Sequence, residues 1–349
     1  MAKIGIVTGI TGQDGSYLIE LLYDKGYKIY GVMRRSSTPT TGRIHGEIWN
    51  KIKNNCICAD LSDGSSIDNI FEYVLHDNNE HEIETIEFYN LAAMSHVGDS
   101  FSIPSYSGDV NALGVTRILE SINKLKIKKK IKFYQASTSE MFGKVSETPQ
   151  NENTPFNPRS PYAISKLYAH WTTKNYRESC GIFACSGILF NHESPRRGIT
   201  FVTKKITSSV AAIKRGEKEL IEIGNLNSYR DWGHAKDYVY AMWLMLQKEK
   251  PDDYVISSGE NHTVREFIEK SFKYINIDIK WKGEGINEIG YDSKTDKTLV
   301  VINPKYFRPL EVDTLLGDCS KAKKILGWKH TYTFDELIEE MVKEDLNCV

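Results

Sequence analysis

Short apolar runs and longer amphipathic stretches alternate along the first half of this sequence. The apolar runs are rich in β-branched and aromatic residues, which favours strands, whereas the longer stretches carry apolar residues at helical spacing. This alternation predicts an α/β fold with a doubly wound parallel sheet, covered by helices on both faces. The pattern predicts strands at 3–8, 28–33, 55–59, 86–91, 131–136 and 182–190, and helices at 16–25, 109–126 and 162–179.

The rhythm changes after Asn191, where prolines and glycines separate shorter elements. Helical spacing returns at 264–274 and 335–345, and the composition of 283–296 is typical of a polar loop. We predict a cofactor domain at 1–190, rejoined by the segment 234–260. Residues 191–349 mainly form a smaller C-terminal substrate-binding domain.

Composition limits the classes of partner. The chain has 349 residues and a formal net charge of −1, so no bulk field favours nucleic acid or an anionic membrane. The six cysteines show no zinc-type spacing, and we expect reduced thiols, no metal site and a cytoplasmic protein.

A glycine-rich loop, Gly9-Ile10-Thr11-Gly12-Gln13-Asp14-Gly15, follows the first strand and opens the first helix. Glycines let the backbone approach a diphosphate, and a helix N-terminus offers free N–H groups and a positive dipole end. In this position the loop predicts a Rossmann dinucleotide site, and a tight turn that binds no phosphate is the alternative.

The residues after the other strands complete this site. Two arginines and two serines follow the second strand, where NAD-preferring sites place an acidic residue, so NADP is favoured over NAD. A solvated surface pair of arginines is the alternative. The expected cofactor contacts are Arg34, Arg35, Ser36 and Ser37 at the ribose, Asp60 and Leu61 near the adenine, and Leu91, Ala92, Ala93, Met94 and Ser95 after the fourth strand.

Candidate catalytic groups follow the fifth strand. Tyr162 and Lys166 are four apart on a predicted helix and share a face. The Lys166 ammonium and a nicotinamide cation can both favour the phenolate form of Tyr162. Thr138 offers a hydroxyl to a substrate, and Glu140 offers the carboxylate that an elimination needs to take a proton next to a carbonyl. An exposed helix pair and a helix-start carboxylate are the structural alternatives.

Together these motifs resemble the extended short-chain dehydrogenase/reductase family, and within it the GDP-mannose 4,6-dehydratases. The resemblance runs from the glycine loop to 326–329. Its most specific blocks are Tyr134-Gln135-Ala136-Ser137-Thr138-Ser139-Glu140, the segment 189–198, Arg230-Asp231-Trp232-Gly233-His234 and the segment 306–312.

The resemblance implies an NADP-dependent hydro-lyase that converts GDP-mannose to GDP-4-keto-6-deoxymannose and water, the first step to GDP-fucose or GDP-rhamnose. Tyr162 is the implied base for oxidation at sugar carbon 4, supported by Lys166, with Thr138 on the carbon 4 hydroxyl. Glu140 is the implied acid and base for water loss across carbons 5 and 6. Tyr106, Lys166, His192 and Arg197 match further NADP-contacting positions.

The dTDP-glucose dehydratases typically carry Thr-Asp-Glu where this chain has Thr138-Ser139-Glu140, which favours the GDP-mannose branch. Ala92 and Phe142 depart from the common Gly and Tyr, and both changes are conservative in size. The nucleotide and its diphosphate have candidate ligands whose alternative role is in domain-interface ion pairs. They are Asn191, Lys205, Arg230, Arg308 and Glu311.

The resemblance also implies a homo-oligomer, a tetramer, in which the segment 35–43 reaches a neighbour's cofactor. Two other functions stay open from the sequence. One is a related enzyme, such as a 4-epimerase or a dehydratase for another nucleotide sugar, against which Glu140 and the segment 191–198 argue. The other is a non-catalytic NADP-binding protein, which usually loses Tyr162, Lys166 or Glu140.

Overall fold

A computed structural model describes residues 1–307, 310, 312 and 314–348. Seven parallel strands form the main sheet in the order β11-β6-β5-β4-β1-β2-β3. This confirms the predicted α/β Rossmann class, and the neighbouring pairs all run parallel. The strands are β1 (Ala2–Thr8), β2 (Lys28–Met33), β3 (Cys56–Cys58), β4 (Ile83–Asn90), β5 (Ile131–Thr138), β6 (Phe183–Leu189) and β11 (Asp253–Ile256).

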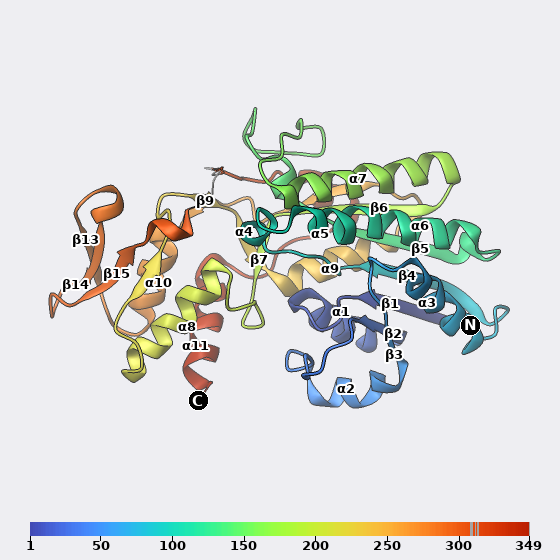
Figure 1. The fold of residues 1–349 in the computed structure, drawn as a ribbon, viewed down its shortest axis with the longest axis horizontal. Coiled ribbons are helices and arrows are strands. Elements are labelled where there is room, and N and C mark those ends of the chain that lie inside the picture. The colour runs from blue at the N-terminus through green and yellow to red at the C-terminus, as the bar shows by residue number, and fades with distance from the viewer. Residues whose placement is uncertain (308–309, 311, 313, 349) are drawn as a thin grey trace.

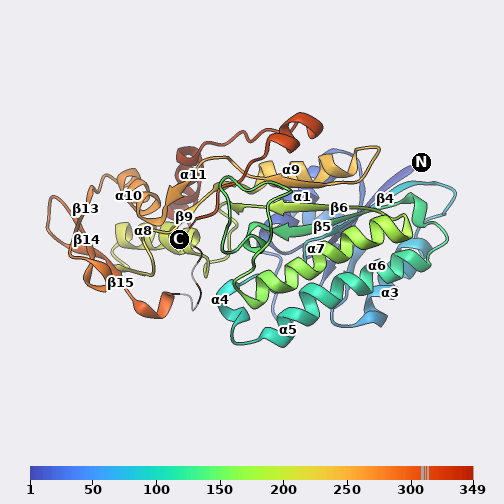
Figure 2. The ribbon, with the colours of Figure 1, turned by 90° about the horizontal axis from the view of Figure 1, so that it is seen from above.

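Helices cover both faces of this sheet because successive side chains of each strand point to opposite sides (Figure 2). On one face Val7 and Ile29 pack with α1 (Gln13–Asp24) and α9 (Ala235–Leu246). On the other, Ile6 and Val32 pack with α3 (Gly64–His76), α6 (Gly114–Lys124) and α7 (Pro161–Cys180). The segment 234–260 therefore returns to the sheet, as α9 and β11.

Shorter elements connect these layers. They are α2 (Gly46–Ile52), α4 (Val97–Ser100), α5 (Pro104–Gly108), the π-helices Asp109–Leu113 and Ala322–Leu326, and the 3-10 turns Lys53–Asn55, Lys128–Lys130, Ser139–Met141, Gly285–Asn287 and Pro304–Tyr306. The helix predicted at 109–126 thus begins with a π-helix and ends at Lys124.

A second, smaller body lies at the other end of the molecule (Figure 1). A mixed four-stranded sheet, β13-β14-β15-β8, packs with α8, α10 and α11 around its own core. Two short pairs, β7 with β10 and β9 with β12, lie between the two bodies. The elements are β7 (Asn191–Glu193), α8 (Val202–Arg215), β8 (Ile221–Ile223), β9 (Tyr229–Arg230), β10 (Trp232–His234), β12 (His262–Thr263), α10 (Val264–Tyr274), β13 (Ile279–Lys282), β14 (Ile289–Asp292), β15 (Thr298–Ile302) and α11 (Phe334–Asn347).

The prediction of a loop at 283–296 is wrong in its second half, which forms β14. Gly290 lets this strand lie against its neighbour, because a Cβ there would sit 2.9 Å from the ring of Trp281. The glycine and charged residues hid a strand that is specified by tertiary packing. Within the described part of the chain, no helix is long and apolar enough to cross a membrane.

Candidate active site

A cleft of about 1610 Å³ opens where the carboxyl ends of β1, β4, β5 and β6 face the smaller body. Most of the side chains predicted to bind cofactor or substrate, and all four predicted to be catalytic, line this cleft. Two do not: Ile10 is fully buried and packs against Gly31, and Ser37 is exposed elsewhere. Arg308 and Glu311 lie outside the described residues.

The glycine loop fits a dinucleotide diphosphate. Gly9 has φ +70, and a Cβ there would meet the backbone nitrogen of Ala92 at 2.9 Å. A Cβ on Gly15 would sit 2.4 Å from the carbonyl oxygen of Gly9, so only glycine permits this tight turn. Gly12 is the N-cap of α1 and supplies no side-chain cap, which leaves the first N–H groups of the helix for an anion.

Two of the predicted cofactor residues from distant segments meet beyond β2. Arg34 donates from Nη1 to the Tyr106 hydroxyl at 2.6 Å, although the two residues are 72 positions apart. Arg35 and Ser36 line the same part of the cleft. Burial acts to raise the pKa of Asp60, but bonds from Ser62 and the charge of Arg34 hold it below its ordinary value.

The predicted catalytic residues converge from β5 and α7. Helix α7 begins at Pro161, and the hydroxyl of its N-cap, Ser160, accepts the N–H of Ala163 at 3.1 Å. This start places Tyr162 near Thr138, whose hydroxyl acts to lower the pKa of the phenol. The Thr138 hydroxyl also accepts the N–H of Glu140 at 3.2 Å. Thr138, Glu140, Tyr162 and Lys166 are each buried and line the cleft.

Burial shifts the pKa values of Tyr162 and Lys166 away from their ordinary values. Burial raises the pKa of Tyr162 to about 12, and the nearby Glu140 carboxylate adds to the rise, while the Thr138 bond opposes it. Burial also lowers the pKa of Lys166 to about 8, and its Nζ donates to the carbonyl of Ala136 at 2.8 Å. Desolvation therefore dominates the pKa of the phenol in the protein alone, and the expected lowering by the Lys166 ammonium together with a nicotinamide cation stays a prediction.

The opposite wall carries the predicted substrate ligands. Asn191 lies on β7, Lys205 on α8 and Arg230 on β9, and all three line the cleft. The Nζ of Lys205 lies 3.2 Å from the ring centroid of Tyr306, and burial lowers the pKa of this lysine. Arg230 is buried and donates to the carbonyl of Tyr229 at 2.8 Å.

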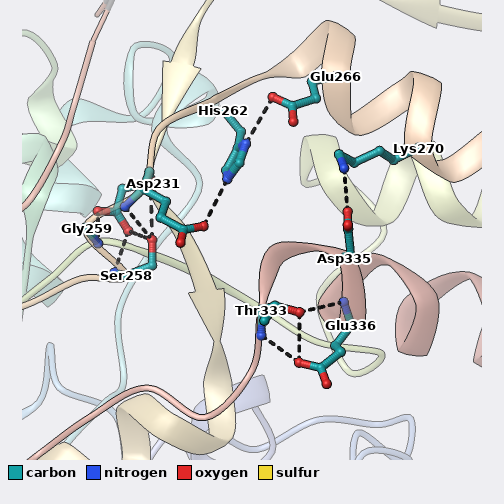
Figure 3. A network of polar contacts seen from close by, with 10 residues as sticks. Asp231, Ser258, Gly259, His262, Glu266, Lys270, Thr333, Asp335 and Glu336 are labelled. Carbon is teal, nitrogen blue, oxygen red and sulfur yellow. Dashed lines mark hydrogen bonds and ion pairs between the residues drawn. The ribbon is translucent and has the colours of Figure 1, made fainter.

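Asp231, directly after Arg230, fixes this wall (Figure 3). Its buried carboxylate accepts the N–H and the hydroxyl of Ser258, both at 2.7 Å. It also accepts the N–H groups of Gly259 at 2.9 Å and Gly317 at 3.3 Å. Burial raises the pKa of Asp231 although these donors act to lower it. The strand that carries Arg230 is thereby tied to two distant chain segments.

Comparison with known proteins identifies the family of this chain. The family model described as "GDP-mannose 4,6 dehydratase" matches residues 6–341. Proteins with this name from Drosophila melanogaster and Dictyostelium discoideum are each 52% identical over 99% of this chain, covering 87% and 97% of their own lengths. The Homo sapiens protein is 51% identical over 99% of this chain and 92% of its own.

The chain belongs to the GDP-mannose 4,6-dehydratase family.

Solved structures with low sequence identity share the overall fold of this family member. The Thermus thermophilus UDP-glucose 4-epimerase complex with NAD superposes with a TM-score of 0.78 at 21% identity, covering 99% of this chain and 100% of the other. The Bacillus anthracis dTDP-glucose 4,6-dehydratase complex with NAD gives 0.76 at 20%, covering 99% and 96%. RMD from Pseudomonas aeruginosa, complexed with NADPH, gives 0.73 at 19% over the whole of both chains.

Some cleft residues of this GDP-mannose 4,6-dehydratase family member were missed from the sequence. Glu193 and Tyr306 lie within blocks that the resemblance rests on, so their position was the available signal. The Glu193 carboxylate pairs with Arg197 at 3.0 Å and holds it at the cleft. Arg43 ends the segment 35–43 that was expected at a neighbour's cofactor, and it lines the cleft of its own chain, where its Nε donates to the carbonyl of Arg196 at 2.7 Å. Among the residues that the structure describes, no His, Cys, Asp and Glu cluster could hold a metal.

Proposed function

We propose that NADP and GDP-mannose share this cleft and that Thr138, Glu140, Tyr162 and Lys166 carry the reaction. The activity is that of the family, GDP-mannose 4,6-dehydratase, a hydro-lyase that forms GDP-4-keto-6-deoxymannose and water. One observation supports the site assignment most. A phenol, a hydroxyl and a carboxylate lie together between a diphosphate-binding loop and a wall with arginine and lysine.

NADP is proposed over NAD because of the charge beyond β2. Arg34 and Arg35 offer guanidinium groups that match phosphate oxygens in pairs, and Ser36 adds a hydroxyl. Asp60 does not supply the acidic ribose contact of an NAD site, because it follows the next strand and accepts from Ser62 at 2.9 Å. Direct titration with each cofactor tests this choice, and a Kd for NAD equal to that for NADP contradicts it.

The chemistry divides among the four side chains. Tyr162 takes the proton of the carbon 4 hydroxyl, which Thr138 orients, and Lys166 holds the nicotinamide ribose. Glu140 removes the proton at carbon 5 and protonates the carbon 6 hydroxyl, which leaves as water. When bound at these residues, a nicotinamide would supply reversible hydride storage between carbon 4 and carbon 6. The proton that Tyr162 takes from the carbon 4 hydroxyl returns to carbon 5, so no net oxidation occurs. A phenol with a pKa of about 12 needs a nearby cation to ionise at neutral pH, and a nicotinamide ring provides one.

We assign the cofactor to residues 1–190 with the returning segment 234–260, and the GDP-sugar mainly to 191–349. Within this division Asn191, Lys205 and Arg230 bind the nucleotide and its diphosphate, and His192 and Arg197 contact the cofactor. Arg308 and Glu311 remain predicted substrate ligands. A homotetramer also remains a proposal, and sedimentation of the purified chain tests it.

Incubation with GDP-mannose and catalytic amounts of NADP tests the function. We expect a 4-keto product lighter by one water, without build-up of NADPH. UDP-glucose and dTDP-glucose serve as matched nucleotide sugars in the same assay. Turnover of either of these, with GDP-mannose left unchanged by folded and cofactor-loaded protein, would falsify the proposal.

A further inference from the structure

A histidine and an aspartate that are 178 positions apart in the sequence form a hydrogen-bonded pair at the glycine loop. His192 Nε2 lies 2.8 Å from Asp14 Oδ2, and His192 Nδ1 lies 2.8 Å from the carbonyl oxygen of Phe190. Both partners are acceptors, and a neutral imidazole can donate from only one nitrogen. The surroundings of His192 therefore select the imidazolium, in which both nitrogens donate.

Further hydrogen bonds, made by Gln13, connect the glycine loop to the segment that begins with Asn191. Gln13 donates from Nε2 to Asp14 Oδ1 and to the carbonyl oxygen of His192, each at 3.0 Å. Its Oε1 accepts the Ser194 hydroxyl at 2.8 Å. The imidazole stacks on Tyr238 with 4.6 Å between ring centroids, so packing fixes its plane as well. The position and the orientation of the His192 imidazole are thus both fixed by its neighbours in the cleft.

Asp14 is an unusual residue to find beside an anion site. It lies in the first turn of α1, where the N–H groups offered to a diphosphate also converge. Its carboxylate alone would repel a diphosphate, whereas paired with an imidazolium it adds no net charge. The charge on His192 therefore changes the net charge beside the glycine loop.

We propose that His192 is a positioning residue whose second proton neutralises Asp14, so that the glycine loop accepts the cofactor diphosphate only while the imidazole is charged. The proposal rests on the NADP binding proposed above and adds a residue-level control of it. It also couples the cofactor loop to β7, the strand that presents Asn191 to the substrate.

Other titratable and charged groups on neighbouring elements lie near this pair. Arg197 follows β7, and Tyr238 comes from α9. Asp14 also interacts with Tyr134 of β5 and with Tyr162 and Lys166 of α7. Burial and Arg197 act to lower the pKa of His192, but Asp14 outweighs them and raises it above its ordinary value. Lys166, with a pKa of about 8, titrates in a nearby range and needs its own control.

NADPH fluorescence titrations from about pH 7 to about pH 9 test the proposal, because an unperturbed His loses its charge near the lower end of this range. In the wild type we expect Kd to rise by up to about tenfold per pH unit above the pKa of His192. His192→Gln should bind about tenfold more weakly at about pH 7, because Asp14 is left unpaired, and should lose this part of the pH dependence.

Two further variants separate charge from structure. Asp14→Asn removes the repelling charge, so at about pH 9 it should bind NADPH more tightly than the wild type does. The double variant Asp14→Asn, His192→Gln should recover affinity relative to His192→Gln. If His192→Gln fails to fold, Asp14→Asn alone carries the test, together with the NMR titration of His192, whose pKa should fall in that variant.

Additive losses in the double variant would overturn the charge argument. So would an unchanged pH slope in His192→Gln, which would assign the titration to Lys166. These results leave the cofactor assignment intact, provided that the wild type binds NADPH at about pH 7. A wild type that does not bind NADPH there contradicts the proposed cofactor, and this inference with it.

Discussion

Replacing Asp231 by Asn tests how the substrate wall is built. In the wild type one carboxylate oxygen accepts from both donors of Ser258, and the other accepts from the N–H groups of Gly259 and Gly317. An Asn can turn its oxygen toward Ser258, but its NH₂ then faces two N–H donors. Both buried N–H groups lose their acceptor, and the chain around Arg230 must move.

The magnitude follows from those two groups. A buried donor left unsatisfied costs about 1–3 kcal/mol. Because burial raises the pKa of Asp231, the neutral amide is easier to bury than the carboxylate, which offsets part of this cost. We therefore expect a loss of about 2–3 kcal/mol in the free energy of unfolding. If the displacement of Arg230 forfeits about 1.4 kcal/mol of substrate binding, KM for GDP-mannose rises about tenfold.

Urea unfolding and steady-state kinetics measure these two effects, with Asp237→Asn as the matched control. Asp237 is also buried, and its carboxylate accepts the N–H and hydroxyl of Thr331 and the N–H of Tyr332. It does not line the cleft. Asp237→Asn should lose comparable stability while KM for GDP-mannose stays unchanged.

The affinity for NADPH should stay within about twofold of wild type in Asp231→Asn, a difference well under 1.4 kcal/mol. The reasoning is refuted if KM is unchanged in Asp231→Asn despite the loss of stability. It is equally refuted if Asp237→Asn raises KM by the same factor. The rise in KM would then follow from lower stability of the whole fold and not from a displaced Arg230.

Three further changes probe two residues of the site and one buried ion pair outside it. Glu140→Gln should lower kcat by at least about a hundredfold, yet still allow carbon 4 oxidation, so NADPH absorbance should appear. Unchanged deuterium exchange at carbon 5 in that variant would contradict its role as the base. Arg34→Met should weaken NADP binding about tenfold and leave NAD binding unaltered, as measured by direct titration. Equal losses for both cofactors would count against a 2′-phosphate contact. Asp253→Asn should destabilise the protein at neutral pH. Burial acts to raise the pKa of Asp253, but bonds from Arg177 hold it below its ordinary value. The stabilisation is therefore present above about pH 4, the unfolded-state value, and is lost as pH falls through the lower folded value. Urea unfolding should show the gap between wild type and variant closing in acid, and a gap that widens there would show the sign to be wrong.

Local patterns determined much of this protein. Short apolar runs predicted β1 and β2, since a parallel strand that is covered on both faces needs apolar residues at successive positions. The glycine loop predicted a diphosphate-binding turn from the sequence alone, because only glycine fits the turn at Gly15. The blocks around Glu140 and Arg230 indicated the family, which the comparisons confirm.

Only the tertiary structure decided which of these residues meet, and in what electrostatic environment. Asp14 and His192 are 178 positions apart, and their contact depends on how β7 packs beside α1. No chain pattern foretold that burial raises the pKa of Tyr162 or that Lys166 bonds to a carbonyl. Periodicity is set between neighbours along the chain, whereas desolvation and pairing depend on every element packed around a side chain, so they exist only once the fold has formed.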